Sequence, residues 1–545
     1  MVRIAFGERL SNMNAPVLST VTLLTALYSA VGTGGDLQFS EVLNSGIVHQ
    51  HTGTGPGIHH ERYFIGGGVA VGDVDGNGYA DVFLVGGYNP DPLFPHPTPN
   101  QLFLNQGGSF VSASLPAFMR PDDCTHSGPL FADFNHDGWL DLLIPGFEDN
   151  CTVLAAGSAN GWTNDTVGSQ LPTTGATIGV AAADYSDDGR LDLFLGRWSS
   201  DGFISQLFEG TLDGSFVDRT VGAFDDINLR FTFTPNFEDF DGDGQLDLLI
   251  AADFGYSKVL RNQGGIFTDM TDPLVITDEN GMGAAVADYD NDGDYDWFVT
   301  SIFDEDGVAE ANWGISGNRL YRNDNGVFVD ATDVAGVREG DWGWGACFAD
   351  FNNDGHLDIF HTNGFHLGNP NPPPPDSCLI DPSFCHDPSR LFLSDGDGTF
   401  TESAAAVGLI DTEQGRGVAC FDFDHDGDQD ILVANNAGPT RVYANQLTGS
   451  QWLTVIATDP VINVAGIGAE VRVASPGGDQ LRRIRAGSNF ASQNAAEAHF
   501  GLASDSLVNE LTVTWPDGFE QTLSNVPTNQ RLLVTKDRIL ISSFD

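Results

Sequence analysis

Residues Asp239–Asp247 read DFDGDGQLD, with aspartate at the first, third, fifth and ninth positions and glycine at the sixth. Carboxylates on alternate residues of a tight loop converge on one point. Several hard oxygen ligands suit Ca²⁺, which accepts about six to eight oxygens, whereas Mg²⁺ demands near-octahedral geometry and keeps several waters. Gly244 fits the sharp turn, because glycine reaches positive φ without a Cβ clash. The stretch therefore predicts a calcium-binding loop.

The same nine-residue pattern, called the cassette below, occurs seven times in the chain. Its starts are separated by 60, 51, 55, 49, 62 and 72 residues, and every copy has aspartate at positions one and nine and glycine at position six. About seven structural Ca²⁺ sites are expected, with side-chain ligands from positions one, three, five and nine and a backbone carbonyl from position seven. The predicted ligand residues are Asp73, Asp75, Asn77, Tyr79, Asp81, Asp133, Asn135, Asp137, Trp139, Asp141, Asp184, Ser186, Asp188, Arg190, Asp192, Asp239, Asp241, Asp243, Gln245, Asp247, Asp288, Asp290, Asp292, Asp294, Asp296, Asp350, Asn352, Asp354, His356, Asp358, Asp422, Asp424, Asp426, Asp428 and Asp430. The cassette at Asp184 is expected to bind most weakly, because Ser186 replaces a carboxylate.

The sequence around each cassette predicts strands. Short apolar runs such as GVAAA and GAAVA precede the cassettes, and β-branched or aromatic runs such as DLLIAA and DWFVTS follow them. A third element, as in NQLFLNQGGSF, has the pattern of two strands joined by a turn. Four-stranded repeats of this length are typical of propeller blades. The fold class is therefore all-β, with a seven-bladed β-propeller over residues 37–447.

The seventh repeat lacks the last strand that the others have. Its missing segment matches LQFSEVLNSGI, residues 37–47, which precedes the first cassette. We expect this stretch to complete the seventh blade and to cover an edge that would otherwise be open for pairing. Residues 450–540 contain alternating strands such as AEVRVAS and LTVTWP and predict a small β-sandwich.

These motifs resemble a known family. The cassettes in their GVAxxD…DLxL settings resemble the FG-GAP or VCBS repeats of integrin-α-like propellers, and GIGAEVRV, AGSNFASQ and LTVTWPDGFEQTL resemble the ASPIC/UnbV domain of the cartilage acidic protein family. The resemblance implies a secreted calcium-binding propeller. Members of the wider repeat class serve as adhesion and ligand-binding platforms, and a few propellers of this type are carbohydrate-active enzymes.

The N-terminal segment and the cysteines fit export. Residues 1–32 contain two arginines and an apolar stretch of about 18 residues ending in small residues, which predicts a signal peptide; an uncleaved anchor is the alternative. Six cysteines permit disulfides in an exported chain. Three groupings are considered: a local Cys378–Cys385 pair, a Cys124–Cys151 pair beside the second cassette, and Cys347 with Cys420 as buried free thiols or a further pair.

The chain is strongly acidic, with a formal net charge of −53. The cassettes supply much of it, since 24 aspartates occupy their side-chain ligand positions. Such a charge argues against nucleic acid and anionic membranes as partners, because both would be repelled. No segment after residue 32 is apolar and long enough to span a bilayer. An extracellular protein or a glycan is the expected partner, or a second copy of the chain in self-assembly.

Three other groups of residues are candidates for a site. Histidines precede the first blade and occur in the insertion of the sixth. Two interpretations are open for them, ordinary loop residues or a transition-metal or catalytic site. These histidines are His49, His51, His59, His60, His361, His366 and His386. Aromatic residues of the long loops fit packing between blades or ligand stacking: Trp198, Trp313, Trp342, Trp344 and Phe365. Arginines of the QLRRIRAG strand fit docking on the acidic propeller or recognition of an acidic partner: Arg482, Arg483 and Arg485.

Two functions remain open on the sequence. The favoured one is a secreted or cell-surface binding, adhesion or assembly module, including a fibre subunit, without catalytic residues. The alternative is a propeller-type carbohydrate-active enzyme, since paired carboxylates hydrolyse glycosides at set separations. The cassette pattern explains the carboxylates better as metal ligands, and no nucleophile elbow, phosphate loop or dinucleotide fingerprint is found.

Overall fold

The computed structural model describes residues 37–51, 66–87, 98–120, 124–147, 149–173, 175–199, 202–304, 314–365, 384, 386–461, 463–487, 489–536 and 538–539. These residues form strands and four short helical turns, η2 (Ala117–Met119), α1 (Thr220–Ala223), η3 (Asp253–Gly255) and α2 (Thr332–Ala335), so the all-β prediction is confirmed. Within the described ranges no helix has the length and apolarity needed to cross a membrane. Several predictions concern residues outside these ranges: the segment 1–32, Cys378, Cys385, His59, His60, His366 and Trp313.

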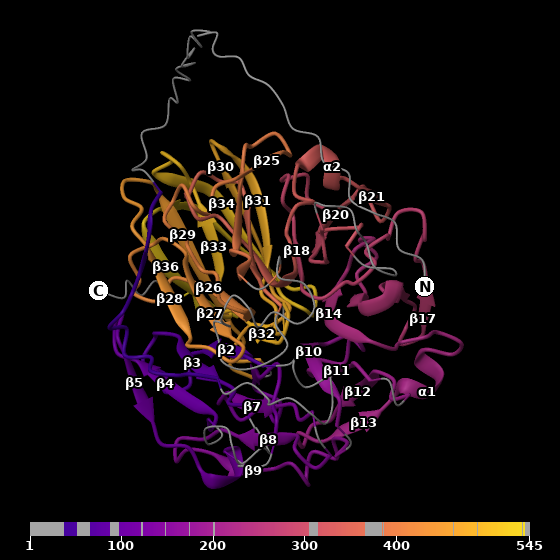
Figure 1. Ribbon diagram of the computed structural model, residues 1–545. Helices are drawn as coiled ribbons and strands as arrows, with labels where there is room; N and C mark the ends of the chain where they lie inside the picture. Colours follow the sequence, from indigo (N-terminus) through magenta and orange to yellow (C-terminus); the bar gives the residue numbers. More distant parts are fainter. Residues whose placement is uncertain are drawn as a thin grey trace, which may run out of the picture. The chain divides into compact units, whose positions relative to one another are not determined.

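Seven antiparallel sheets, called sheets 1 to 7, follow one another along the chain (Figure 1). Sheet 1 contains β2 (Val69–Gly72), β3 (Asp81–Leu84), β4 (Gln101–Asn105) and β5 (Phe110–Ala113). Sheet 2 contains β6 (Leu130–Ala132), β7 (Asp141–Ile144), β8 (Val153–Ala156) and β9 (Thr163–Asn164). Sheet 3 contains β10 (Thr177–Ala183), β11 (Asp192–Arg197), β12 (Gln206–Gly210) and β13 (Phe216–Asp218). Sheet 4 contains β14 (Thr232–Glu238), β15 (Asp247–Ala252), β16 (Lys258–Asn262) and β17 (Phe267–Asp269).

The remaining three sheets of this series repeat the same order of strands. Sheet 5 contains β18 (Ala284–Ala287), β19 (Asp296–Val299), β20 (Arg319–Asn323) and β21 (Phe328–Asp330). Sheet 6 contains β22 (Gly343–Ala349), β23 (Asp358–Asn363), β24 (Arg390–Ser394) and β25 (Phe400–Glu402). Sheet 7 contains β26 (Gly415–Phe421), β27 (Asp430–Asn435), β28 (Arg441–Asn445) and, as its fourth strand, β1 (Phe39–Glu41).

The fourth strand of sheet 7 comes from the beginning of the described chain. Phe39 pairs with Asn445 and Glu41 with Tyr443 in antiparallel register. The expectation that residues 37–47 complete the seventh repeat rather than the first is confirmed for Phe39–Glu41. β1 covers the edge of β28 that would otherwise be open for pairing.

Apolar clusters join each sheet to the next. Buried side chains of sheets 1 and 2 form one cluster, and similar clusters join sheets 2 and 3, 3 and 4, 4 and 5, 5 and 6, and 6 and 7. A further cluster joins sheet 7 to sheet 1, with Val69 and Phe103 on one side and Phe421 and Leu432 on the other. The order of packing therefore closes on itself.

The two ends of the sheets differ. Each cassette connects the first two strands of its sheet, and this connection has eight residues in all seven sheets. Because neighbouring strands are antiparallel, the connection from second to third strand lies at the opposite end, where its length varies from 5 to 26 residues. We call these the cassette end and the loop end.

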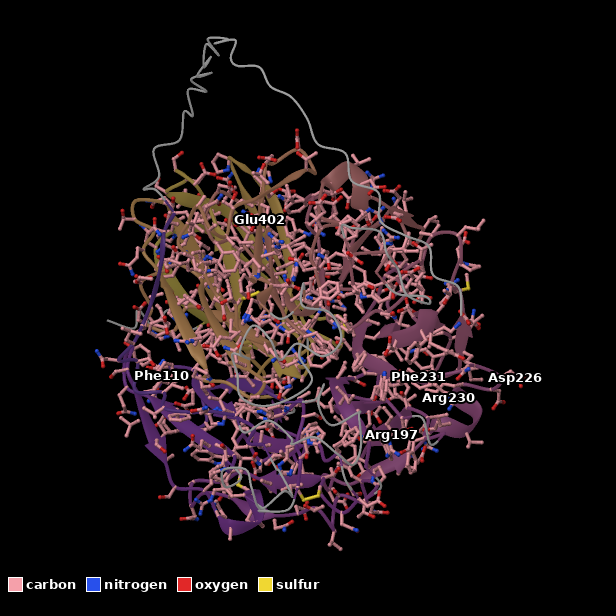
Figure 2. The ribbon with its side chains drawn as sticks, in the orientation of Figure 1. Phe110, Arg197, Asp226, Arg230, Phe231 and Glu402 are labelled. Carbon is pink, nitrogen blue, oxygen red and sulfur yellow. A yellow bond between two sulfur atoms is a disulfide. The ribbon has the colours of Figure 1, made fainter. Side chains whose placement is uncertain are left out.

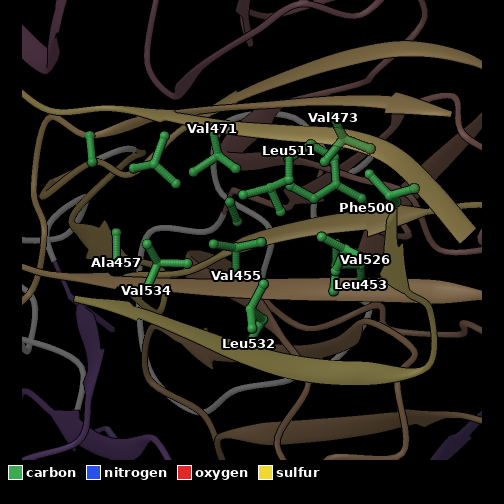
Figure 3. Close-up of a cluster of buried hydrophobic side chains, with 14 of the residues drawn as sticks. Leu453, Val455, Ala457, Val471, Val473, Phe500, Leu511, Val526, Leu532 and Val534 are labelled. Carbon is green, nitrogen blue, oxygen red and sulfur yellow. The ribbon is translucent and has the colours of Figure 1, made fainter. Parts of the chain in front are cut away.

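The last part of the chain forms two further sheets. One contains β33 (Ala498–Gly501), β29 (Trp452–Thr458), β36 (Gln530–Thr535) and β37 (Arg538–Ile539). The other contains β31 (Gly478–Arg483), β30 (Glu470–Ser475), β34 (Leu507–Thr514) and β35 (Glu520–Pro527). Their apolar faces share one buried cluster, in which Val471, Val473 and Leu511 of one sheet face Val455 and Val534 of the other (Figure 3).

A segment between β31 and β33 contacts the first strands of sheets 1, 2, 3, 4, 6 and 7. We call residues 486–487 and 489–494 the inserted segment; it includes β32 (Ser492–Gln493), which pairs in parallel with β2. Gln493 accepts a hydrogen bond from the Phe131 amide at 2.6 Å and donates one to the Phe131 carbonyl at 2.9 Å. The Phe490 ring packs against Phe233 of β14 at 5.5 Å and Trp344 of β22 at 5.1 Å. The C-terminal sheets are thereby anchored in the core of the repeats.

Candidate metal centres

Hydrogen bonds within each cassette set the loop's shape. In DFDGDGQLD, the Asp239 carboxylate accepts the amides of Asp243 at 3.1 Å and Gly244 at 2.9 Å. Asp247 accepts the Phe240 amide at 3.3 Å and, through its other oxygen, the Asn262 amide at 2.7 Å. Gly244 has φ +87°, the conformation for which glycine was predicted at position six. These bonds turn the chain so that alternate side chains point inward.

Four cassettes bring three carboxylates together. In each of them the side chains of positions one, three and nine offer oxygens that all lie within 4.8 Å of one another. The four groups are Asp73, Asp75 and Asp81; Asp239, Asp241 and Asp247; Asp288, Asp290 and Asp296; and Asp422, Asp424 and Asp430. The other three cassettes have Asn135, Ser186 and Asn352 at position three, so they lack the third carboxylate.

The position-five carboxylates stand outside these groups, although the sequence predicted them as ligands. Asp243 pairs with the Arg261 guanidinium at 2.9 Å, and Arg261 also reaches Asp241 at 2.7 Å. Asp188 pairs with Arg190. An arginine therefore supplies positive charge to the carboxylates of the cassettes at Asp239 and Asp184.

Burial makes the clustered carboxylates hard to ionise without a cation. Burial, reinforced by neighbouring aspartates and opposed by hydrogen bonds from backbone amides, raises the pKa to about 8 at Asp247 and about 9 at Asp296. Burial, partly offset by Arg531, likewise raises the pKa of Asp422 to about 8. Among the described residues, Oδ1 of Asp290 and Oδ1 of Asp422 are buried and have no hydrogen-bond partner. Crowded, buried, unsatisfied carboxylate oxygens fit a hard cation such as Ca²⁺.

These pKa values predict how pH acts on the protein without metal. Unfolded aspartates ionise near pH 4, whereas folded Asp247 and Asp296 hold protons up to about pH 8 and 9. Since the folded state binds more protons, its stability is lost as pH rises from about 4 through those values. Buried histidines act in the opposite direction, because burial lowers their pKa, for example to about 4 at His126. Their effect on stability is confined to pH values below about 6.5. The urea midpoint of chelated protein should therefore fall between pH 6.5 and 8.5.

The calcium-loaded protein is the control for this measurement, because bound metal keeps the carboxylates ionised. Its midpoint should change much less over the same pH interval. A midpoint of chelated protein that stays level or rises between pH 6.5 and 8.5 would contradict the burial of unpaired carboxyl groups.

An asparagine at the end of the third strand contacts each of the four three-carboxylate groups. The sequence analysis did not predict this residue as part of the site. Asn262 donates its side-chain amide to the Tyr185 carbonyl of the preceding sheet at 3.0 Å, while its backbone amide reaches Asp247. Asn323 binds the Phe240 carbonyl in the same way at 2.7 Å. Asn105 and Asn445 repeat the contact. The recurring N in LFLNQGG, VLRNQGG and LYRNDNG was the available signal.

The arginines of β31 and the following residues dock the C-terminal sheets on the repeats. Arg483 lies 3.2 Å from Oε1 of Glu238, and Arg485 donates to Oε2 of Glu238 at 3.1 Å. The Glu238 side chain is fully buried at the end of β14, directly before a cassette. Arg482 lies near Asp288 and Asp350, and its charge lowers the pKa of both carboxyl groups, against the larger effect of burial. Of the two predicted roles, the docking contact is the one observed.

The described residues contain two disulfides. Cys124 and Cys151 are joined, with Cα atoms 5.6 Å apart, as the sequence suggested. Cys347 of β22 and Cys420 of β26 are also joined, with Cα atoms 6.5 Å apart, so the expectation of buried free thiols is wrong. Sheets 6 and 7 pack face to face and bring the two sulfurs together.

Histidines in the described ranges belong to no group that could hold a metal. His361 is buried beside the Asn318 amide, with Nε2 3.1 Å from Nδ2, and burial lowers its pKa to about 3. His49 lies 3.1 Å from the Thr440 hydroxyl. His361 lies within β23, so the expectation of a loop position is wrong for it, whereas His49 lies outside the strands, as expected for a loop residue.

The aromatic residues of the loop end either pack against neighbouring residues of the protein or belong to a partly exposed cluster. Trp344 is fully buried and donates its indole N–H to the Gly364 carbonyl at 2.9 Å. Trp342 stacks on Phe365 with ring centroids 3.9 Å apart. Trp198 belongs to a partly exposed cluster described below.

Consecutive four-stranded sheets, each with an acidic cassette between its first two strands, define an all-β repeat protein. The FG-GAP-like repeat family matches residues 73–144, 239–299, 303–361 and 384–433, and the ASPIC and UnbV family matches residues 462–539. The chain thus combines FG-GAP-like repeats with a C-terminal ASPIC and UnbV segment, which confirms its resemblance to the cartilage acidic protein family.

Curated relatives include cartilage acidic protein 1 of Xenopus tropicalis, 25% identical over 479 residues, with 83% of this chain and 61% of that protein covered. The same protein of Mus musculus is 26% identical over 476 residues, covering 72% and 70%. The chain therefore spans less than two thirds of the frog relative's length.

Solved structures match this chain only with low TM-scores. A rhamnogalacturonan lyase, YesW, has a TM-score of 0.36 at 13% identity, covering 74% of this chain and 75% of that one. The V. cholerae biofilm matrix protein Bap1 has a TM-score of 0.34 at 12% identity, covering 76% and 61%. Similarity of this degree carries no functional inference.

Proposed function

We propose that the chain is an extracellular calcium-binding protein in which sheets 1 to 7 are the blades of a β-propeller, residues 37–447, and the last two sheets form a β-sandwich, residues 450–540. Each cassette would hold one Ca²⁺ through its predicted ligands, most weakly at Asp184. The closed packing order of the sheets and the shared cluster of the C-terminal sheets support this architecture. The metal is structural in this proposal, since it neutralises buried carboxylates at a turn between strands.

The proposed activity is non-catalytic binding, in adhesion or in extracellular assembly, through the loop end. The contrast between the two ends carries this proposal: the cassette connections are all eight residues long, whereas the opposite connections range from 5 to 26 residues. Loops that vary on a rigid scaffold are where binding sites concentrate. At the cassette end, by contrast, residues of the C-terminal sheets already contact the repeats, as at His499 Nε2 and Asn353 Oδ1, 2.7 Å apart.

Secretion is part of the proposal. Disulfides persist in oxidising compartments and are rare in the cytosol, and both described pairs are buried in the repeats. The curated relatives carry the name cartilage acidic protein, which suggests an extracellular setting for this chain as well.

One observation favours a carbohydrate-active enzyme as the second candidate. Asp253, at the loop end of sheet 4, has a pKa that desolvation raises to about 7, in the range suited to a general acid. Its carboxylate accepts the Trp198 indole N–H at 3.0 Å, which is also a sufficient structural role.

A paired binding and turnover screen separates the two candidates. Calcium-loaded protein should bind a polysaccharide or a matrix protein saturably, and it should release no reducing ends or unsaturated products from polysaccharides. Turnover that Asp253→Asn abolishes while binding persists would reject the non-catalytic function. Turnover that Asp253→Asn leaves unchanged would point to a contaminating enzyme.

A further inference from the structure

An exposed aromatic cluster lies at the loop end of sheets 3 and 4. Phe231 and Phe254 meet edge to face with ring centroids 5.1 Å apart, and Trp198 lies 5.7 Å from Phe231. Tyr256 adds a fourth ring 5.4 Å from Phe231. The Phe254 side chain is 46% exposed, although it belongs to this cluster. A large ring held at the surface by other rings is available to a ligand.

The backbone of this cluster is strained. Phe231 has φ +59° and Phe254 has φ +58°, a left-handed conformation that is a genuine outlier for a bulky side chain. Neighbouring contacts hold it: the Asp253 amide donates to the Phe231 carbonyl at 3.0 Å, and the Gly255 amide donates to the Glu279 carbonyl at 2.8 Å. Strain of this kind concentrates at ligand-binding sites.

The connection that leads into Phe231 carries charged groups of both signs. The Arg230 guanidinium lies 5.0 Å from the centre of the Phe231 ring. Both residues are labelled in Figure 2. Nε of Arg230 is buried and has no hydrogen-bond partner among the described residues. Asp225 and Asp226, on the same connection, are exposed. A set of donors therefore lies beside an aromatic face, and two exposed carboxylates belong to the connection that carries Arg230.

We propose that this cluster binds a neutral saccharide, with a sugar ring on Phe254 and its hydroxyls on Arg230 and the two aspartates; the inference rests on the proposed binding function and names its ligand class. Hydroxyls both donate and accept, so they satisfy both kinds of group. An anionic polymer would meet Asp225, Asp226 and a chain of net charge −53. An apolar peptide would bury the guanidinium without a partner, which is costly.

The test uses calcium-loaded protein in affinity electrophoresis through gels containing xylan, mannan or mixed-linkage β-glucan, with polygalacturonate and alginate as acidic counterparts. Retention by at least one neutral polysaccharide is expected, and Phe254→Gly should weaken it at least tenfold. Glycine adopts the left-handed conformation without strain, so this variant should melt at the same temperature or higher. Phe519→Ala is the matched control, because Phe519 is 42% exposed on the C-terminal sheets; its retention should be unchanged.

Three results would overturn the inference: no retention by any neutral polysaccharide, retention by the acidic polymers alone, or equal retention of Phe254→Gly and the parent protein. The last result, together with saturable binding, would leave the proposed binding function standing and place its site elsewhere on the loop end. An absence of binding to any polysaccharide or matrix protein would reject both.

Discussion

Chelation of calcium is expected to lower the melting temperature of the protein by on the order of 10 °C or more. A ligand bound only by the folded state contributes about 2.7 kcal/mol per site when it is present at 100 times its Kd, and the four three-carboxylate clusters together would contribute roughly 10 kcal/mol. In a domain of this size each kcal/mol corresponds to about 2 °C. Differential scanning calorimetry with and without excess chelator measures the change.

Re-addition of metal supplies the control for that experiment. Ca²⁺ should restore the original transition, whereas Mg²⁺ at the same concentration should restore it poorly, since Mg²⁺ demands near-ideal octahedral geometry and keeps several waters. Isothermal titration should resolve several sites. A melting temperature that chelator leaves unchanged, or a titration without calcium binding, would contradict the structural role of the cassettes.

Replacement of Glu238 by alanine is expected to reduce the free energy of unfolding by about 3–5 kcal/mol, because it removes the acidic partner of Arg485 and leaves Arg483 with Glu470 alone. Glu238 is fully buried between Arg483 and Arg485. Both guanidiniums also lie over the Tyr295 ring, at 5.1 and 4.8 Å from its centre, and have little access to water. Urea denaturation followed by tryptophan fluorescence measures the loss.

An exposed ion pair provides the matched comparison. Glu209 pairs with Arg219 at 2.7 Å, and the Arg219 side chain is 49% exposed. Glu209→Gln should therefore change stability by less than about 1 kcal/mol. Equal effects of Glu238→Ala and Glu209→Gln would show that the docking of the C-terminal sheets does not depend on the buried charges.

The sequence predicted the parts of the fold that are local. Metal-ligand spacing is confined to nine residues, so the cassettes, their turns and the strands on both sides could be identified from one chain. The pairing of β1 with β28 followed from a missing strand in one repeat and an extra one at the other end. Both arguments use the repeat itself as an internal reference.

Contacts between distant segments were not predictable in this way. The inserted segment consists of Ala486 and Gly487 and, after Ser488, the stretch NFASQN. Its sequence shows neither strand alternation nor helical periodicity, because the surrounding strands determine its conformation. Cys347 and Cys420 are 73 residues apart on equivalent strands, and only the packing of sheets 6 and 7 shows that they meet. The role of Asn262 and its equivalents likewise depends on the neighbouring sheet.

The inserted segment and β1 have a consequence for how the chain folds. Glu41 pairs with Arg441 across 400 residues, and Phe131 with Gln493 across 362. Contacts of such sequence separation form slowly, since the loop must close before they are gained. Sheets 1 and 2 therefore lack their contacts with the inserted segment until residues near 490 have been synthesised. The complete fold is thus expected to form only after the C-terminal sheets have been synthesised.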